Sequence, residues 1–278
     1  MAVVEATAAR RVTRPSDRVR LGVLSGAGLG VAVLWLSLLV LLPLAAVVAR
    51  GTGAGWSSFW AAFSTHAALE AIRLTVLCAL AVALFNAVMG TLVAWVLVRD
   101  DFAGKRLVEV FIDLPFALPT IVAGLVLVSL YGPRSPIGLT WYATRPGIVV
   151  ALLFVTLPFV VRAVQPVLLA LETDVEEAAA SLGAGPMTRF RRIVLPSIWP
   201  AIMSGAALAF GRAMGEYGAV ILISGGVART QLASQYIYGQ IESGYLSDAA
   251  ATSTALLFIS VAVMATLGAL QRWTARRG

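Results

Sequence analysis

The chain opens its apolar part with the stretch LGVLSGAGLGVAVLWLSLLVLLPLAAVVA, residues 21–49, which holds no charged side chain. A helix needs roughly 20 apolar residues to cross the hydrocarbon core of a bilayer, so this stretch is long enough to span it. Of the 278 residues, 59% are hydrophobic and 13% are charged, whereas a soluble domain averages about 45–50% apolar and about 25% charged residues. The sequence therefore predicts an all-α integral membrane protein.

Five more apolar segments follow, and each is long enough to cross a membrane. The six expected spans are 21–49, 72–98, 108–131, 147–170, 198–224 and 249–271. Proline removes a backbone donor and bends a helix, so we expect Pro115 and Pro119 to kink the third span and Pro158 and Pro166 to kink the fourth. The freed backbone groups in the third span can face a polar cavity, or the kink can serve packing alone.

The basic residues predict the orientation of the chain. They number 21 against 14 acidic residues, and they gather at the ends of apolar segments, so membrane topology explains them better than nucleic-acid binding does. Five arginines precede the first span, and cytoplasmic segments of membrane proteins are rich in Lys and Arg. We expect residues 1–20 to form a basic cytoplasmic tail, residues 21–278 to form the six-helix domain, and both termini to lie in the cytoplasm.

The segment 172–196 has the pattern of two short helices joined by a turn. A threonine and an aspartate at its start are each followed three residues later by a glutamate, as in a capping box. Gly183 can end the first helix, and Pro186 can begin a second one that runs until Pro196. On these grounds alone, an ordinary solvated helix and a docking element for another protein are equally good interpretations.

The same segment resembles the EAA motif of the permease subunits of ABC importers. In that family the motif lies on a coupling helix that docks in a cleft of the cytoplasmic ATPase subunit and passes its movement to the spanning helices. The resemblance covers roughly residues 70–272 and implies the ABC type I importer permease fold, with a coupling loop at 172–196. The residues that match the motif, at its complete spacing, are Glu177, Ala178, Ala179, Gly183, Ile193, Leu195 and Pro196.

The fifth expected span holds two charged residues, Arg212 and Glu216, four positions apart. This spacing would place both side chains on one helix face, where an ion pair is feasible. Charges inside a membrane are costly and usually pair with one another or line a path. The pair can fix helix packing, or Arg212 can meet an anion during its passage, and the sequence leaves both roles open.

Further motifs narrow the resemblance to one branch of these permeases. The run 215–218, Gly-Glu-Tyr-Gly, resembles the signature of the sulfate and molybdate branch, and the residues around Pro119, Pro158 and Pro166 are similar to the T-type subunit of sulfate/thiosulfate importers. The resemblance implies transport of sulfate or thiosulfate across the plasma (inner) membrane, with a molybdate importer as the alternative. It also implies a second permease chain of the W type, an external sulfate-binding protein, and two copies of an ATP-binding subunit that hold ATP and Mg²⁺.

The chain lacks the residues that bond chemistry would need. A phosphate-binding loop requires Gly-Lys followed by Ser or Thr, but the single lysine, Lys105, precedes Arg106. One cysteine and one histidine do not supply a zinc site or a catalytic triad. We therefore expect a translocating subunit without enzyme activity, metal or cofactor of its own. A secondary transporter driven by an ion gradient would also explain the six spans, but it leaves the EAA spacing unexplained.

Overall fold

The structure, a computed structural model, describes residues 23–171 and 173–275. All regular elements in this part of the chain are helices, which confirms the expected all-α class. The tail expected over residues 1–20 lies outside the described residues. It therefore stays a prediction.

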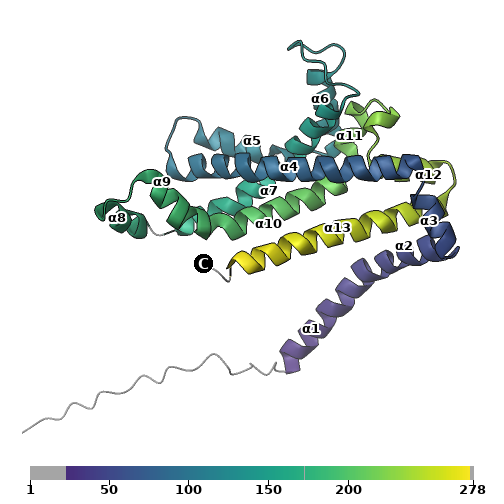
Figure 1. The fold of residues 1–278 in the computed structure, drawn as a ribbon, viewed down its shortest axis with the longest axis horizontal. Helices are drawn as coiled ribbons and strands as arrows, with labels where there is room; N and C mark the ends of the chain where they lie inside the picture. The colour runs from purple at the N-terminus through teal and green to yellow at the C-terminus, as the bar shows by residue number, and fades with distance from the viewer. Residues whose placement is uncertain (1–22, 172, 276–278) are drawn as a thin grey trace, which may run out of the picture. The chain divides into compact units, whose positions relative to one another are not determined.

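The chain divides after Ala46 into two units, which we describe separately (Figure 1). The described part of the first unit contains α1 (Val23–Leu36), a π-helical turn (Ser37–Leu41) and the start of α2 (Leu42–Thr52). None of residues 26–46 is buried, and they are apolar on every side of the helix, as in a helix surrounded by lipid. The continuous segment Gly26–Thr52 is long and apolar enough to cross a membrane.

The second unit holds the remaining helices, and α4, α7 and α10 pack pairwise at its centre with α13 alongside α10. Its elements are α3 (Trp56–Phe63), α4 (His66–Arg99), α5 (Lys105–Ala117), α6 (Thr120–Tyr131), α7 (Arg145–Ala170), α8 (Thr173–Ser181), α9 (Pro186–Arg189), a π-helical turn (Phe190–Val194), α10 (Leu195–Met214), α11 (Gly218–Ile223), a 3-10 turn (Ala228–Thr230), α12 (Ala233–Glu242) and α13 (Leu246–Ala275).

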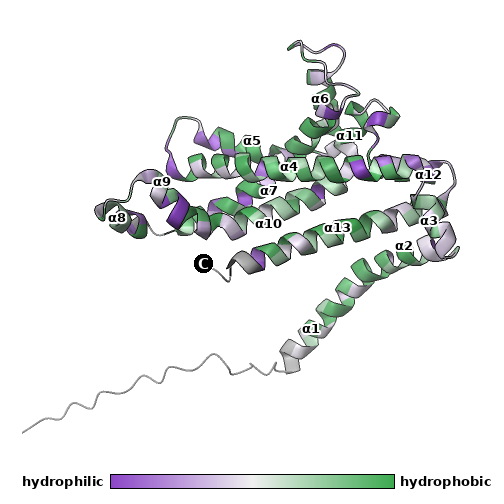
Figure 2. Cartoon of the chain, in the orientation of Figure 1, coloured by the Kyte–Doolittle hydropathy of each residue, from purple (hydrophilic) through white to green (hydrophobic). Residues whose placement is uncertain are grey.

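Four unbroken helical segments of this unit are long and apolar enough to cross a membrane: His66–Arg99, Arg145–Ala170, Pro186–Met214 and Leu246–Arg272. Together with Gly26–Thr52 they make five candidate spans, and a sixth if the bent pair α5 and α6 is one broken span. Hydrophobic residues dominate α2, α4 and α13 (Figure 2). Five of the expected spans therefore correspond to unbroken helical segments in the structure, and the third corresponds to the bent pair α5 and α6.

The segment expected as the third span, 108–131, is two helices, and the chain bends by 117° between them. Leu118 between them is extended, with φ of −86° and ψ of 134°, because the residue before a proline is driven out of the helical region. Pro119 is the N-cap of α6, whereas Pro115 lies inside α5. The break therefore falls at the second proline of this segment. In the fourth expected span, α7 continues through both of its internal prolines.

The fifth expected span, 198–224, ends early. Its helix α10 ends at Met214, so Glu216 lies beyond the helix end, in the link to α11. The expectation that Arg212 and Glu216 share one face of a spanning helix is therefore wrong. Glycines on both sides of Glu216 weaken the helix at this point, since glycine in a helix interior is destabilising by roughly 0.5–1 kcal/mol relative to alanine.

The same helix begins earlier than expected. From Pro186 the chain stays helical through the π-helical turn and into α10, so the expectation that Pro196 ends a short helix is also wrong. In the π-helical turn the N–H of Leu195 donates to the carbonyl of Phe190 five residues back, which widens the helix just before the proline. Pro196 then falls in the first turn of α10, so the loop and the span form one continuous helix.

Small residues bring the central helices close together. A Cβ atom on Gly90 of α4 would lie 2.8 Å from the Cβ of Val160 in α7, and one on Gly205 of α10 would lie 2.8 Å from the Cα of the same valine. Small residues let membrane helices approach in this way. Two buried clusters fill the interior around this contact, one of them containing Leu152 and Phe210 and the other containing Leu97, Val161, Val194 and Ile198.

Candidate functional site

The loop 172–196 folds as α8, a tight turn and α9. Gly183 has a φ of +85°, its N–H donates to the carbonyl of Ala180 at 2.9 Å, and the N–H of Ala184 donates to the carbonyl of Ala179 at 3.0 Å. This pair of bonds is the Schellman motif that ends a helix. No other group lies within 4 Å of the place where a Cβ on Gly183 would stand, so the backbone conformation alone requires glycine here.

The first half of the motif lies on the outside of the loop. Glu177, Ala178 and Gly183 are exposed, and Ala179 is partly buried. Three large apolar side chains of the same segment are also exposed: Val175 at 50%, Leu182 at 89% and Met187 at 68%. The segment from α8 to α9 therefore exposes both the first half of the motif and large apolar side chains, and these three apolar residues were not singled out from the sequence.

The second half of the motif joins the loop to the bundle. Ile193 and Leu195 are partly buried and Pro196 is exposed, but Val194 between them is fully buried. Val194 belongs to the buried cluster that also contains Ile198 and Leu97. The structure thus places Glu177 to Gly183 on the outside of the loop and Ile193 to Pro196 at the point where the loop enters the core.

Sequence analysis missed the contacts that hold the loop to α4. Arg99, the last residue of α4, forms an ion pair with Glu176 of α8, and its guanidinium lies 5.3 Å from the ring centroid of Trp95. Trp95 in turn meets Phe190 edge-to-face, with ring centroids 5.4 Å apart. The pattern had marked Glu176 only as a possible capping residue, and nothing in it pointed to a partner 77 positions away.

A second ion pair not foreseen from the sequence joins α5 to α7. The Nε of Arg162 donates to Asp113 Oδ1 at 2.8 Å, its second terminal nitrogen contacts Asp113 Oδ2, and its first donates to Gln165 Oε1 at 2.6 Å. Such a bidentate pairing of guanidinium and carboxylate fixes the relative orientation of the two side chains and also adds electrostatic attraction. It attaches the broken segment to the unbroken helix α7.

Arg212 and Glu216 do pair, across the end of α10. Arg212 NH1 lies 2.6 Å from Glu216 Oε2, and the glutamate side chain is 1% exposed against 33% for the arginine. The other carboxylate oxygen, Oε1, accepts the N–H of Ala219 at 2.8 Å, so Glu216 also caps the start of α11. The two charges therefore come together by the turn of the chain after Met214, and not by helical spacing.

The two breaks of the membrane segments lie against each other. A Cβ on Gly218 would stand 2.2 Å from Thr120 Oγ1, and one on Gly124 would stand 2.8 Å from the carbonyl oxygen of Ala219. Helices α6 and α11 therefore begin side by side at Thr120 and Gly218. Ser234 of α12 covers this place and donates to the carbonyl of Glu216 at 2.7 Å.

Two tyrosine rings, one in the link before α11 and one on α12, stand beside the same break. The rings of Tyr217 and Tyr238 lie 5.1 Å apart, and Glu242 accepts a hydrogen bond from Tyr238, which raises the pKa of that phenol. Tyr238 therefore stays neutral over the physiological pH range, since its ordinary pKa is already about 10.

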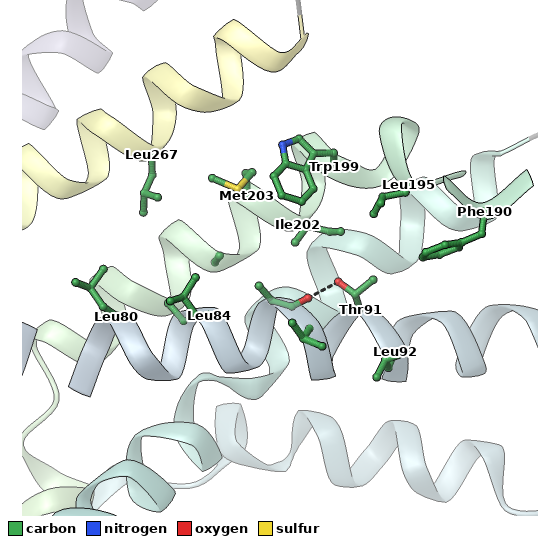
Figure 3. A pocket seen from close by; sticks show the side chains of 14 residues that line it. Leu80, Leu84, Thr91, Leu92, Phe190, Leu195, Trp199, Ile202, Met203 and Leu267 are labelled. Atoms are coloured by element: carbon green, nitrogen blue, oxygen red, sulfur yellow. Dashed lines mark hydrogen bonds between the residues drawn. The ribbon is translucent and has the colours of Figure 1, made fainter. Parts of the chain in front are cut away.

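An apolar groove of about 390 Å³ runs between α4, α10 and α13, from Phe190 at one end to Leu80 at the other (Figure 3). Its one hydroxyl, on Thr91, donates to the carbonyl of Ala87 at 2.6 Å, and the indole N–H of Trp199 is the other side-chain polar group among the lining residues, none of which is charged. Burying an unpaired charge in apolar surroundings is strongly unfavourable. This groove is therefore unsuited to an oxyanion, and the break around Arg212 is the better candidate for an anion path.

Comparison with known proteins identifies the family to which this chain belongs. The family model for the binding-protein-dependent transport system inner membrane component matches residues 86–277. The chain belongs to this family. It is therefore a multi-pass permease subunit of the inner membrane, the transport component of an ABC importer as distinct from its ATPase.

Relatives of this permease cover nearly the whole chain. The sulfate transport system permease protein CysT of Synechocystis is 41% identical over 254 residues, which is 88% of this chain and 89% of that protein. The protein of the same name from Salmonella typhimurium is 39% identical over 261 residues, 90% of this chain and 93% of that one.

A solved structure supports the fold of this permease. The bacterial ABC transporter involved in the import of the acidic polysaccharide alginate matches with a TM-score of 0.73 and 18% identity, over 90% of this chain and 95% of that one. This likeness confirms the ABC type I importer permease fold expected from the sequence.

Proposed function

We propose that this permease subunit carries sulfate, and thiosulfate as a related oxyanion, through the membrane in an ATP-driven importer. The observation that carries the proposal is the likeness, at about 40% identity over nearly the whole chain, to proteins named sulfate transport system permeases. The turn at Gly183, the exposed motif residues of α8 and the buried Val194 suit a loop that receives a push from outside the bundle and delivers it to the core.

The proposed complex contains this chain, a second permease chain of the W type, two copies of an ATP-binding subunit and an external sulfate-binding protein. ATP and Mg²⁺ belong to the ATP-binding subunits. Support for partners of these kinds comes from a related structure, an alginate ABC transporter in complex with its periplasmic protein. Both termini and the loop 172–196 lie in the cytoplasm in this proposal, because the basic residues favour that side.

In the proposed cycle, ATP binding closes the two ATPase subunits and moves the docked α8. Glu177, Ala178 and Ala179 form the face of α8 that the ATPase cleft receives, and Gly183 keeps the turn to α9 in shape. Ile193, Leu195 and Pro196 carry the movement into α10. The spans then reopen toward the outside to receive the anion. This chain supplies half of the path and no bond chemistry.

Arg212 is the proposed contact for the anion during its passage. Among the described residues its ion-pair partner is Glu216, through one terminal nitrogen, while a guanidinium has five N–H donors. One third of the side chain is exposed, so donors remain available to a passing oxyanion. Glu216 has the structural role, because it is buried and holds both Arg212 and the start of α11.

The test is uptake of labelled sulfate by cells that lack this chain, with and without the wild-type gene and with the ATPase subunit present or deleted. Unlabelled thiosulfate and molybdate serve as competitors. Uptake that requires both proteins and is suppressed better by thiosulfate than by molybdate is the expected result. Loss of molybdate uptake alone would assign the chain to a molybdate importer. Uptake that persists without the ATPase would favour the ion-gradient transporter and contradict the proposal.

A further inference from the structure

The docking helix α8 has little apolar attachment of its own. None of its described side chains, residues 174–181, is buried. Its internal side-chain bond, from Ser181 to the carbonyl of Glu177 at 3.0 Å, stays within the helix. Because buried apolar surface normally holds helices in place, α8 needs another attachment to keep a fixed position against the bundle.

The ion pair between Glu176 and Arg99 supplies that attachment. The two side chains are 15% and 21% exposed, so water screens them far less than it screens a surface pair. Their positions also suit both helices: an acidic residue in the first turn of α8 and a basic residue in the last turn of α4 each favour the local helix dipole.

Arg99 is itself held in place by its neighbours. Its guanidinium lies over Trp95, within the range of a cation–π contact, and Trp95 packs edge-to-face against Phe190 of the π-helical turn. The pair therefore joins three parts: α8 on the docking surface, the end of α4, and the segment that leads into α10. We name these four residues, Glu176, Arg99, Trp95 and Phe190, the α4 link.

We infer that the α4 link is a second route by which movement of α8 reaches the membrane helices, with Glu176 and Arg99 as its positioning residues. The first route is the chain itself, from α9 through Val194 into α10. Packed interiors transmit displacement because they have little free volume, and α4 packs directly on α7 and α10. A push on α8 therefore reaches α4 at once and does not depend on bending of α10. The inference rests on the proposed function of the loop.

The experiment uses the purified complex of this chain with its partner permease, ATPase and binding protein, reconstituted in liposomes. Sulfate accumulated per ATP hydrolysed is measured for wild type, Glu176→Gln, Arg99→Gln and the double variant. Asp174→Asn is the matched control, because Asp174 is an exposed acidic residue in the same turn of α8. Copurification of the ATPase subunit reports assembly.

We expect each single variant to lower the ratio of sulfate to ATP about fivefold or more, as coupling energies of contacting residues suggest. The double variant should be no worse than the poorer single variant, since the two residues act through one contact. ATPase copurification should stay at the wild-type level, and Asp174→Asn should keep the wild-type ratio. Arg99→Lys keeps the charge but loses the planar guanidinium, so its ratio of sulfate to ATP should lie between those of wild type and Arg99→Gln. If Arg99→Gln does not insert into the membrane, Arg99→Lys replaces it as the test variant.

Several results would overturn the inference. An unchanged ratio in both single variants would remove the link from coupling, and losses that multiply in the double variant would show that the two residues act separately. If ATPase copurification fell together with the ratio, the Glu176–Arg99 pair would be needed for assembly of the complex and would have no separate role in coupling. Wild-type transport that does not need ATP would instead contradict the proposed function itself, so the two failures are distinguishable.

Discussion

Gly183 offers the sharpest test of the loop, because the structure separates backbone strain from crowding at this position. Its φ of +85° lies in the left-handed region, where a residue with a Cβ costs roughly 1–2 kcal/mol. The space around it is open, so a methyl group adds strain but meets no other group of this chain. Gly183→Ala should therefore disfavour the turn between α8 and α9 by a factor of about 5–30.

The assay is ATP-dependent sulfate uptake with membrane insertion and ATPase copurification measured in parallel. We expect Gly183→Ala to lower uptake about 5–30-fold while insertion stays normal, because the residue lies outside the spans. Gly183→Asn should be milder, since asparagine tolerates the left-handed conformation, and Gly183→Asp should be the most damaging if α8 enters a close-fitting ATPase cleft.

Gly185 provides the matched control. It lies two residues further along the same turn and is also in open space, but its φ is −67°, which any residue adopts. Gly185→Ala should therefore keep wild-type uptake. The reasoning fails if Gly183→Ala transports normally, or if Gly185→Ala is as damaging as Gly183→Ala. A larger defect for Gly183→Asn than for Gly183→Ala would show that size at the docking surface matters and backbone strain does not.

Three further predictions concern the membrane part. Arg212→Ala should lower sulfate uptake more than it lowers complex assembly, and equal losses would assign Arg212 to packing. Gly218→Ala should destabilise the detergent-solubilised complex by about 1–3 kcal/mol, because the new methyl group would stand 2.2 Å from Thr120 Oγ1. The expected readout is a lower melting temperature. An unchanged melting temperature would refute the close contact between the starts of α6 and α11. Arg162→Lys should also lower the melting temperature, since a single ammonium group cannot replace the two-pronged pairing with Asp113, and a variant as stable as wild type would show that the pair adds nothing.

The spans were predictable because membrane crossing is a property of single segments. An uncharged run such as 21–49 is recognisable from its length and composition alone, and α7 and α13 follow from the same argument. The loop was predictable for a similar reason, since the cap, the glycine turn and the proline start are all local signals. These features need no knowledge of what the segment packs against.

The break after Met214 was not predictable from local signals. The apolar pattern continues to residue 224, so a single span was the natural expectation. The chain turns at Gly215 because Glu216 caps α11 and pairs with Arg212, and because Gly218 fits against Thr120 of another segment. The break thus depends on a contact between residues about a hundred positions apart, which spacing alone does not contain.

The partner of Arg99 was hidden for the same reason. The positive-inside pattern accounts for an arginine at a helix end, and the capping pattern accounts for Glu176, so each residue had a local explanation. Only the folded structure shows that Arg99 and Glu176 form an ion pair with each other. Asp113 and Arg162 were likewise in separate expected spans, and only the packing of α5 against α7 shows that they pair.

The π-helical turn at Phe190–Val194 gives the helix between loop and bundle one extra residue. A π-helical turn holds one residue more than an α-helical turn, so the extra residue is taken up within that turn and the helix on its two sides stays in phase. Removing one residue here would let the turn close as an ordinary α-helical turn, and α9 and α10 would keep their present facing. One residue removed from the regular part of α10 would instead turn everything before it by about 100° around the axis, and Glu176 would face away from Arg99. The widened turn is therefore the one place on this helix where the length of the chain can change without losing that ion pair.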